Sequence, residues 1–202
     1  MFQVQATHPF RMPVERQRLH TRSVEYNGYR RADSLWDIEG ELRDLRHYDT
    51  QVYEKDLLPA GQFVHRMAIT ATVDDALLVR EITSRMADTP FQFCKDVEDS
   101  LQAIVGVHMG KGWRLAINER LGGVESCTHL RELLVNMATA ALQTIPTWQF
   151  QERHRLGEPA PDERPHFLGQ CHSWRLDGPV VMKYQPQFFQ PTATAGNGPA
   201  KE

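Results

Sequence analysis

The residues best suited to chemistry in this sequence are Cys127 and His129, which fall where a long amphipathic helix is expected to begin. A thiol at a helix start feels the positive end of the helix dipole and unpaired backbone N–H groups, and both favour the thiolate. Arg131 lies four residues after Cys127 and could stabilise the negative charge, while His129 could transfer protons. The structural alternative is that Ser126 or Thr128 only caps the helix and Cys127 is a small buried residue.

A metal site is a second interpretation of the same region. Cys94 falls at the start of another expected helix, and His65 falls on the apolar side of an expected strand. Together with Cys127 and His129, these residues would form a soft tetrahedral site for zinc or an iron–sulfur cluster. The sequence has no CxxC pair, so the spacing alone is not diagnostic of a metal.

Two basic side chains near the N-terminal end could bind a substrate. His20 and Arg22 are two residues apart in an expected strand, so they share one face and could receive a substrate carboxylate. Arg131 is the third candidate for this role. The alternative is that His20 and Arg22 lie on an exposed strand edge.

Composition limits the class of protein. The chain has 202 residues, 41% of them hydrophobic, and a formal net charge of −3. We expect one domain over residues 18–188, with an N-terminal arm over 1–17 and a flexible tail over 189–202. The charge balance gives no footprint for nucleic acid or a membrane surface, so a small-molecule substrate or a protein partner is expected.

The sequence also lacks motifs that would indicate export, a membrane span or a nucleotide cofactor. No apolar run has the length of a signal peptide or a membrane span, and three widely spaced cysteines fit a reducing compartment, so we expect a cytoplasmic protein. No dinucleotide fingerprint or phosphate loop is present, and no cofactor is expected unless zinc or iron is bound. Nothing in the sequence indicates an oligomeric state.

The pattern along the chain predicts the α+β class, with a small antiparallel sheet followed by packed helices. Strands are expected over 21–26, 36–43, 65–73 and 77–83, with a hairpin turn at Asn27-Gly28 and another turn at Asp74-Asp75. Helical spacing follows Pro90, then recurs over 113–121 and from Leu130 to a stop at Pro146. We expect a charged loop over 152–164 and a C-terminal hairpin over 167–184, turning at Asp177-Gly178.

The sequence resembles a bacterial family known as domain of unknown function 2889. The resemblance covers roughly residues 18–142, and the matching residues are His20-Thr21-Arg22, Trp36-Asp37-Ile38-Glu39-Gly40, Gly61, His65, Met67, Pro90, Cys94, Gly112-Trp113, Gly122-Gly123 and Cys127-Thr128-His129-Leu130. The resemblance implies that the gene for this protein lies among genes for aromatic-compound breakdown. The architecture is also similar to SufE/NifU-like proteins, in which reactive or cluster-binding residues occupy places similar to those of His65, Cys94 and Cys127, although the glycine-rich cysteine loops of the scaffold proteins are absent.

These observations lead to one main hypothesis and two alternatives. The main hypothesis is a hydrolase or addition–elimination enzyme for a carboxylated ring-cleavage intermediate, with Cys127 as the nucleophile or as the thiolate that positions water, and His129 as the proton carrier. His20, Arg22 and Arg131 would bind the substrate. The alternatives are a metal-binding module that uses His65, Cys94, Cys127 and His129, and a protein-interaction domain without chemistry.

Overall fold

The computed structural model describes residues 14–159 and 164–191. The chain divides into two compact units, Met1–Gln149 and Phe150–Glu202. Much of the expected N-terminal arm and of the expected tail lies outside the described residues, and the single domain expected over 18–188 remains a prediction. Every residue of the candidate site described below belongs to the first unit.

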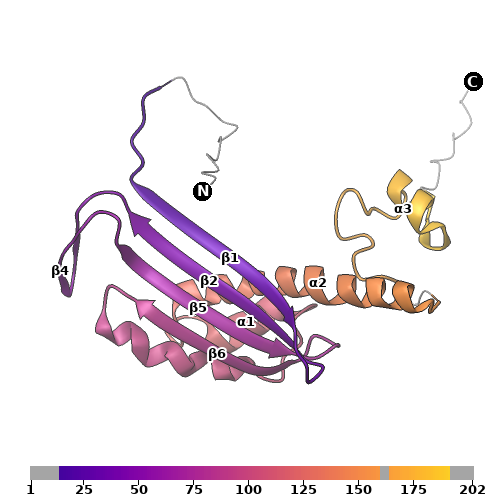
Figure 1. The fold of residues 1–202 in the computed structure, drawn as a ribbon, viewed down its shortest axis with the longest axis horizontal. Helices are drawn as coiled ribbons and strands as arrows, with labels where there is room; N and C mark the ends of the chain where they lie inside the picture. Colours follow the sequence, from indigo (N-terminus) through magenta and orange to yellow (C-terminus); the bar gives the residue numbers. More distant parts are fainter. Residues whose placement is uncertain (1–13, 160–163, 192–202) are drawn as a thin grey trace, which may run out of the picture. The chain divides into compact units, whose positions relative to one another are not determined.

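The first unit is built on a four-stranded antiparallel sheet with the order β1-β2-β5-β6. These strands are β1 (His20–Arg30), β2 (Trp36–Arg46), β5 (Phe63–Val73) and β6 (Val79–Asp88). A small hairpin of β3 (Thr50–Val52) and β4 (Lys55–Leu58) lies between β2 and β5 in the chain. In Figure 1 the helices of this unit lie on one face of the sheet, and the α+β class is therefore confirmed.

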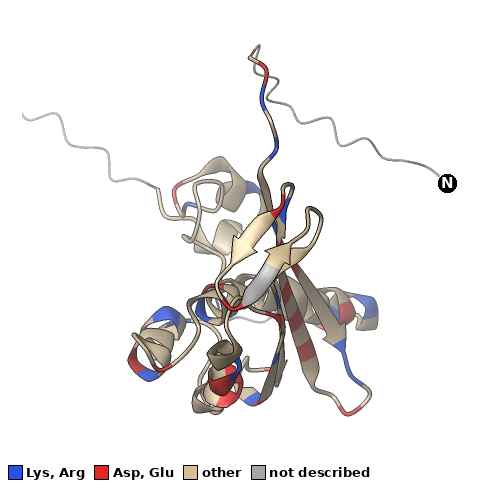
Figure 2. Cartoon of the chain, turned by 90° about the vertical axis from the view of Figure 1, so that its left-hand side faces the viewer, with Lys and Arg blue, Asp and Glu red and all other residues tan. Residues whose placement is uncertain are grey.

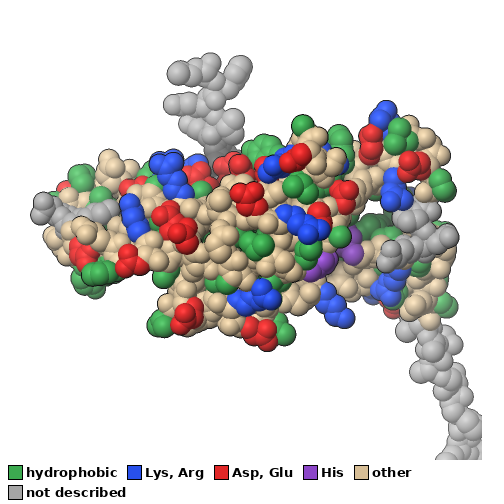
Figure 3. Space-filling view, turned by 90° about the horizontal axis from the view of Figure 1, so that it is seen from below, with side chains coloured by type: hydrophobic (Ala, Val, Ile, Leu, Met, Phe, Trp, Pro, Cys, Tyr) green, Lys and Arg blue, Asp and Glu red, His purple; other side chains and the backbone are tan. Residues whose placement is uncertain are grey.

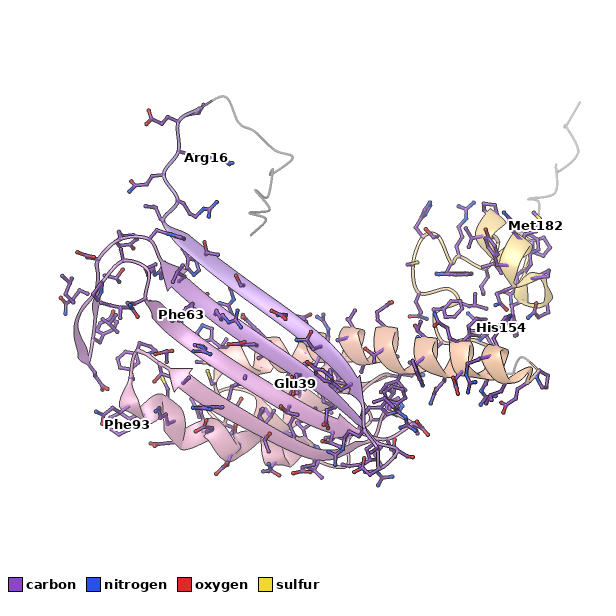
Figure 4. All side chains as sticks on the ribbon, viewed as in Figure 1. Arg16, Glu39, Phe63, Phe93, His154 and Met182 are labelled. Atoms are coloured by element: carbon purple, nitrogen blue, oxygen red, sulfur yellow. The ribbon has the colours of Figure 1, made fainter. Side chains whose placement is uncertain are left out.

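Alternation with a period of two divides the sheet into a buried and a wet face. Trp36, Ile38 and Leu42 of β2 are buried, whereas Glu39 is exposed. Acidic residues form bands across the strands in Figure 2, and Glu39 is labelled on the sheet in Figure 4. The inner face packs against the helices and forms the core.

The expected hairpin turn at Asn27-Gly28 is wrong. Strand β1 continues through both residues, and the chain turns after Arg31, whose N–H donates to the carbonyl of Leu35 over 2.9 Å. Gly28 serves close packing instead, because a Cβ atom at this position would lie 2.3 Å from Thr144 Oγ1. The glycine therefore lets a helix approach the strand, which a local sequence pattern does not reveal.

The turn at Asp74-Asp75 is present and leads into β6. Asp74 Oδ1 accepts hydrogen bonds from the backbone N–H groups of Ala76 and Leu78, both over 2.9 Å. The strand expected over 77–83 is confirmed in type, but it begins at Val79 and extends to Asp88.

Three helical segments follow the sheet: η1 (Gln92–Ile104), which is a 3-10 helix, α1 (Trp113–Leu121) and α2 (Thr128–Leu156). Segment α1 has the expected bounds and ends before Gly122. The expected stop at Pro146 is wrong, because α2 passes through it and occupies the first residues of the loop expected over 152–164. A proline removes one backbone hydrogen bond, and the helical residues around it maintain the others.

The second unit contains α3 (Pro179–Tyr184) and η2 (Pro186–Phe188). The hairpin expected over 167–184 is wrong, since no strand is found among the described residues of this segment. Pro179 occupies the first turn of α3, where the missing N–H is harmless, whereas a strand would need that donor. Among the described residues, no helix combines the length and apolar character needed to cross a membrane.

Candidate functional site

Cys127 occupies the N-cap position of α2. Its carbonyl accepts the first helical hydrogen bond, from the N–H of Arg131 over 3.0 Å, and helical geometry begins at Thr128. Ser126 does not cap the helix: its hydroxyl donates to the Leu121 carbonyl over 2.9 Å and holds the preceding loop against the end of α1. The Cys127 sulfur thus lies where a capping oxygen usually meets the free N–H groups of the first turn.

A thiol and an imidazole face each other at this helix start. Cys127 Sγ lies 3.8 Å from His129 Nδ1. Burial raises the pKa of the Cys127 thiol, but hydrogen bonds with the His129 ring and with the backbone of Leu130 and His129 outweigh burial, so this pKa lies below its usual value. The hydrogen bond with Cys127 raises the pKa of His129 above its usual value, against the effect of burial. Both shifts favour a thiolate–imidazolium pair.

Asp44 is the centre of a polar cluster on the otherwise apolar face of the sheet. It lies in β2, opposite Arg22 of β1 and His65 of β5, and is 4% exposed. Its Oδ1 lies 3.0 Å from His20 Nε2, and its Oδ2 lies 3.4 Å from Arg22 and 3.2 Å from His65 Nδ1. These contacts come from three neighbouring strands, so the sheet register itself assembles the cluster.

Sequence reasoning missed Asp44, although a signal was available. The buried alternation of Trp36, Ile38, Gly40 and Leu42 continues directly to residue 44, which places a carboxylate on the core face. A carboxylate in such a place requires charged or hydrogen-bonding partners. The carboxylate that His20 and Arg22 receive in the structure is therefore Asp44 of the protein itself.

His65 joins the Asp44 cluster to the thiol. Its ring contacts that of His129 in a tilted arrangement, with centroids 4.1 Å apart and planes inclined by 37°. Burial and the nearby charge of His129 lower the pKa of His65, and Asp44 opposes this only in part. A chain of contacts thus runs from Asp44 through His65 and His129 to Cys127. Figure 3 shows histidine side chains together at the surface, with basic side chains beside them.

An ion pair fixes the beginning of α2 against β1. Arg22 donates to Glu132 Oε2 over 2.7 Å while its other nitrogen faces Asp44. Tyr26, on the same face of β1, donates its hydroxyl hydrogen to the Leu133 carbonyl over 2.9 Å. Glu132 therefore holds Arg22.

The remaining predicted residues lie in different surroundings. Arg131 donates to the carbonyls of Leu121 and Gly123 over 2.9 and 3.1 Å, so it braces the loop before α2. Cys94 is partly buried in η1 and packs against the core. Among the described residues, one group could hold a metal: Asp44, His65 and His129 each offer a ligand atom, all within 4.8 Å of one another. Neither Cys94 nor Cys127 belongs to it.

A pocket of about 740 Å³ adjoins this cluster. Residues of β1, α1 and the first turns of α2 line it, including Arg22, Thr128 and Glu132. Cys127 and His129 are not part of the lining, but Thr128 lies between them in the chain and Arg22 contacts both the pocket and Asp44. The thiol and the pocket are thus adjacent features of one site region.

Comparison with protein families bears on this region directly. The model of the family described as "Protein of unknown function (DUF2889)" matches residues 20–143, which is more than half of the chain. The chain belongs to this family. The DUF2889 segment begins at His20 and includes Asp44, His65, Cys127 and His129, so the whole cluster lies within it.

No curated protein and no solved structure matched the chain. The similarity to SufE/NifU-like proteins expected from the order of elements is not shown. The DUF2889 match thus identifies the family of this chain but not its activity.

Proposed function

We propose that this protein is a small-molecule enzyme that uses Cys127 as a nucleophile and His129 as its proton carrier. The observation that carries the proposal is the 3.8 Å contact of Cys127 Sγ with His129 Nδ1, together with pKa shifts in opposite directions that favour the ion pair. A positioned base and a thiol with a lowered pKa are the two requirements of nucleophilic cysteine catalysis.

The reaction class is hydrolysis through a covalent intermediate. The Cys127 thiolate attacks an acyl carbon, the sulfur–carbon bond forms, and the bond to the leaving group breaks as the His129 imidazolium gives that group a proton. Water then attacks the thioester while neutral His129 takes a proton from it, and cleavage of the thioester restores the thiolate. Addition–elimination on an unsaturated acid would use the same pair.

The proposed substrate is a carboxylated intermediate of aromatic-compound breakdown, an expectation that stems from the family resemblance. His20 and Arg22 are less suited to binding it than the sequence indicated, because Asp44 already contacts both. Their proposed role is to hold Asp44, which in turn positions His65 beside His129.

The direct test is acylation by 4-nitrophenyl acetate. We expect a burst of nitrophenolate and one acetyl group on Cys127, located by peptide mass spectrometry, followed by slower turnover. Cys127→Ala should abolish the burst, and His129→Gln should slow it. Cys171→Ala, which removes an exposed thiol, should leave it unchanged. A burst of equal size in Cys127→Ala would overturn the proposal, provided that its circular dichroism matches the wild type.

A metal-binding module is the second candidate, because Asp44, His65 and His129 present three ligand atoms of types that zinc and ferrous iron accept. Two features make it the weaker one. Arg22 lies 3.4 Å from Asp44 Oδ2 and opposes a cation there, and the His65 and His129 rings already contact each other, with centroids 4.1 Å apart. If a metal is bound, elemental analysis should give about one zinc or iron per chain, and His65→Gln should lose it.

A further inference from the structure

The pocket beside the thiol has an apolar floor that protein atoms leave partly uncovered. Val24 of β1 and Val135 of α2 offer exposed and half-buried side chains to it, whereas Leu42, Ile117 and Leu133 of the lining lie beneath and are buried. Val24 is 45% exposed although it shares the helix-facing side of β1 with Arg22 and Tyr26. An apolar side chain on the inner face of a sheet is normally covered, so this floor suits an apolar ligand body.

The pocket lining carries more positive than negative side chains, and only some of the positive ones have an acidic partner. Three arginines and one acidic residue line it, and the acidic residue, Glu132, pairs with Arg22. Asp44 contacts Arg22 as well, so the charge of this arginine is compensated twice. The positive charges that remain are those of Arg114 and Arg131.

Both arginines can bind an anion, but they differ in how the protein holds them. Arg131 is held by the carbonyls of Leu121 and Gly123 and by the Thr128 hydroxyl, which are uncharged acceptors that fix the guanidinium without neutralising it. Arg114 lies on the exposed side of α1 and has no ion-pair or hydrogen-bond partner within the described part of the chain. Asn118 and Asn136 add amide groups to the same lining. Guanidinium groups in such a setting bind carboxylates and phosphates.

The volume of the pocket sets the size of the ligand. Pockets of roughly 300–1,000 Å³ hold drug-sized molecules. At about 740 Å³, this pocket exceeds what a short open-chain acid would fill. The pocket therefore has room for an apolar body of at least one ring with a linker, in addition to an anionic group.

We propose that this pocket binds an amphiphilic organic anion, with its apolar body against Val24 and Val135 and its carboxylate or phosphate between Arg114 and Arg131. The proposal goes beyond the thiol chemistry, because binding here does not require Cys127. It assigns to Arg114 the role that sequence reasoning gave to Arg22.

Isothermal titration calorimetry with three ligands of one scaffold tests it. These are 4-phenylbutyrate, its neutral amide 4-phenylbutyramide and 4-phenylbutyl phosphate. We expect the carboxylate or the phosphate to bind about tenfold or more tightly than the amide, since a charge-assisted contact is worth at least one factor of ten. The tighter of the two anions identifies the anionic group.

Matched variants locate the binding. Arg114→Gln should weaken anion binding about tenfold and leave the amide unchanged, because it removes one charged contact from an exposed position. Arg85→Gln removes the same charge from an exposed position on β6, outside the pocket, and should leave all three ligands unaffected.

Three results would overturn the proposal: equal binding of anion and amide, no binding of any of the three ligands, or undiminished anion binding by Arg114→Gln. Cys127→Ala should bind the anions like the wild type. A protein that binds them but is not acylated at Cys127 would therefore contradict the proposed enzyme and retain the ligand site.

Discussion

The Nδ1 atom of His65 lies 3.2 Å from Oδ2 of Asp44, on the side of the sheet that forms the core. This contact couples a buried charge to a ring that contacts His129. Changes at Asp44 should therefore affect both the stability of the sheet and the position of the thiol's partner.

Asp44→Asn should lower the free energy of unfolding by about 3 kcal/mol. This is the low end of the cost of breaking a buried ion pair, because Arg22 retains Glu132 as a partner. Denaturant unfolding measures the change. Glu39→Gln is the matched control, since it removes a carboxylate from the exposed face of the same strand and should stay within about 0.5 kcal/mol of the wild type. Similar effects of the two substitutions would contradict the role given to Asp44.

The alkylation rate of Cys127 should depend on His129 and on pH. The lowered thiol pKa means that the reactive thiolate is present from a lower pH upwards and is lost as the pH falls through that value. His129→Gln removes the main stabilising partner, so the thiol pKa should rise and the rate profile should move to higher pH. The rate at neutral pH should then fall by about tenfold for every pH unit that the profile moves. Iodoacetamide labelling read by peptide mass spectrometry gives the profile.

The exposed Cys171 is an internal control for this experiment, and its profile should be the same in both proteins. An unchanged Cys127 profile in His129→Gln would mean that the two side chains are neighbours without electrostatic coupling.

Gly28→Ala should destabilise the protein by about 1–3 kcal/mol, the usual cost of overpacking, because the new methyl group would meet the Thr144 side chain. Thr144→Gly should relieve the clash, so the double variant should lose less than the sum of the two single variants. A double-mutant cycle measured by thermal or denaturant unfolding checks this coupling. Strict additivity would show that β1 and α2 do not approach at this point.

Pro146→Ala should raise the free energy of unfolding by about 2 kcal/mol. Proline costs about 3 kcal/mol relative to alanine inside a helix, and it returns up to about 1 kcal/mol by restricting the unfolded chain. Pro179→Ala is the control, since Pro179 stands in the first turn of α3, where proline is well tolerated. No gain in Pro146→Ala would indicate that α2 gains nothing from a restored hydrogen bond at this position.

The contrast between β2 and Gly28 illustrates what the sequence could predict. The alternation in β2 is a property of one strand with one wet face, so the expected strand is found and its apolar positions are the buried ones. The role of Gly28 depends on Thr144, more than a hundred residues away, and the local Asn-Gly pattern carried no information about that helix. The expected stop at Pro146 was wrong for a similar reason. The proline removes one backbone hydrogen bond, but α2 continues because helical residues precede and follow it.

The residues of the candidate site also differ in how well the sequence predicts their contacts. Cys127 and His129 are close in the chain and near a helix start, so their contact could be predicted from spacing. The Asp44 cluster depends on the register of three strands, which fixes Arg22 opposite Asp44 and Asp44 opposite His65. No short motif encodes that register. The sequence therefore suggested a substrate role for Arg22 without revealing that Asp44 and Glu132 already contact this side chain.

The ion pair between Arg22 and Glu132 joins residues 110 positions apart. During synthesis, β1 leaves the ribosome long before α2 exists, so Arg22 and the helix-facing side of β1 gain their α2 partners only after most of this unit has been translated. Contacts of such separation are slow to form, because the intervening chain must first be ordered. The completed charge network is therefore a late product of folding.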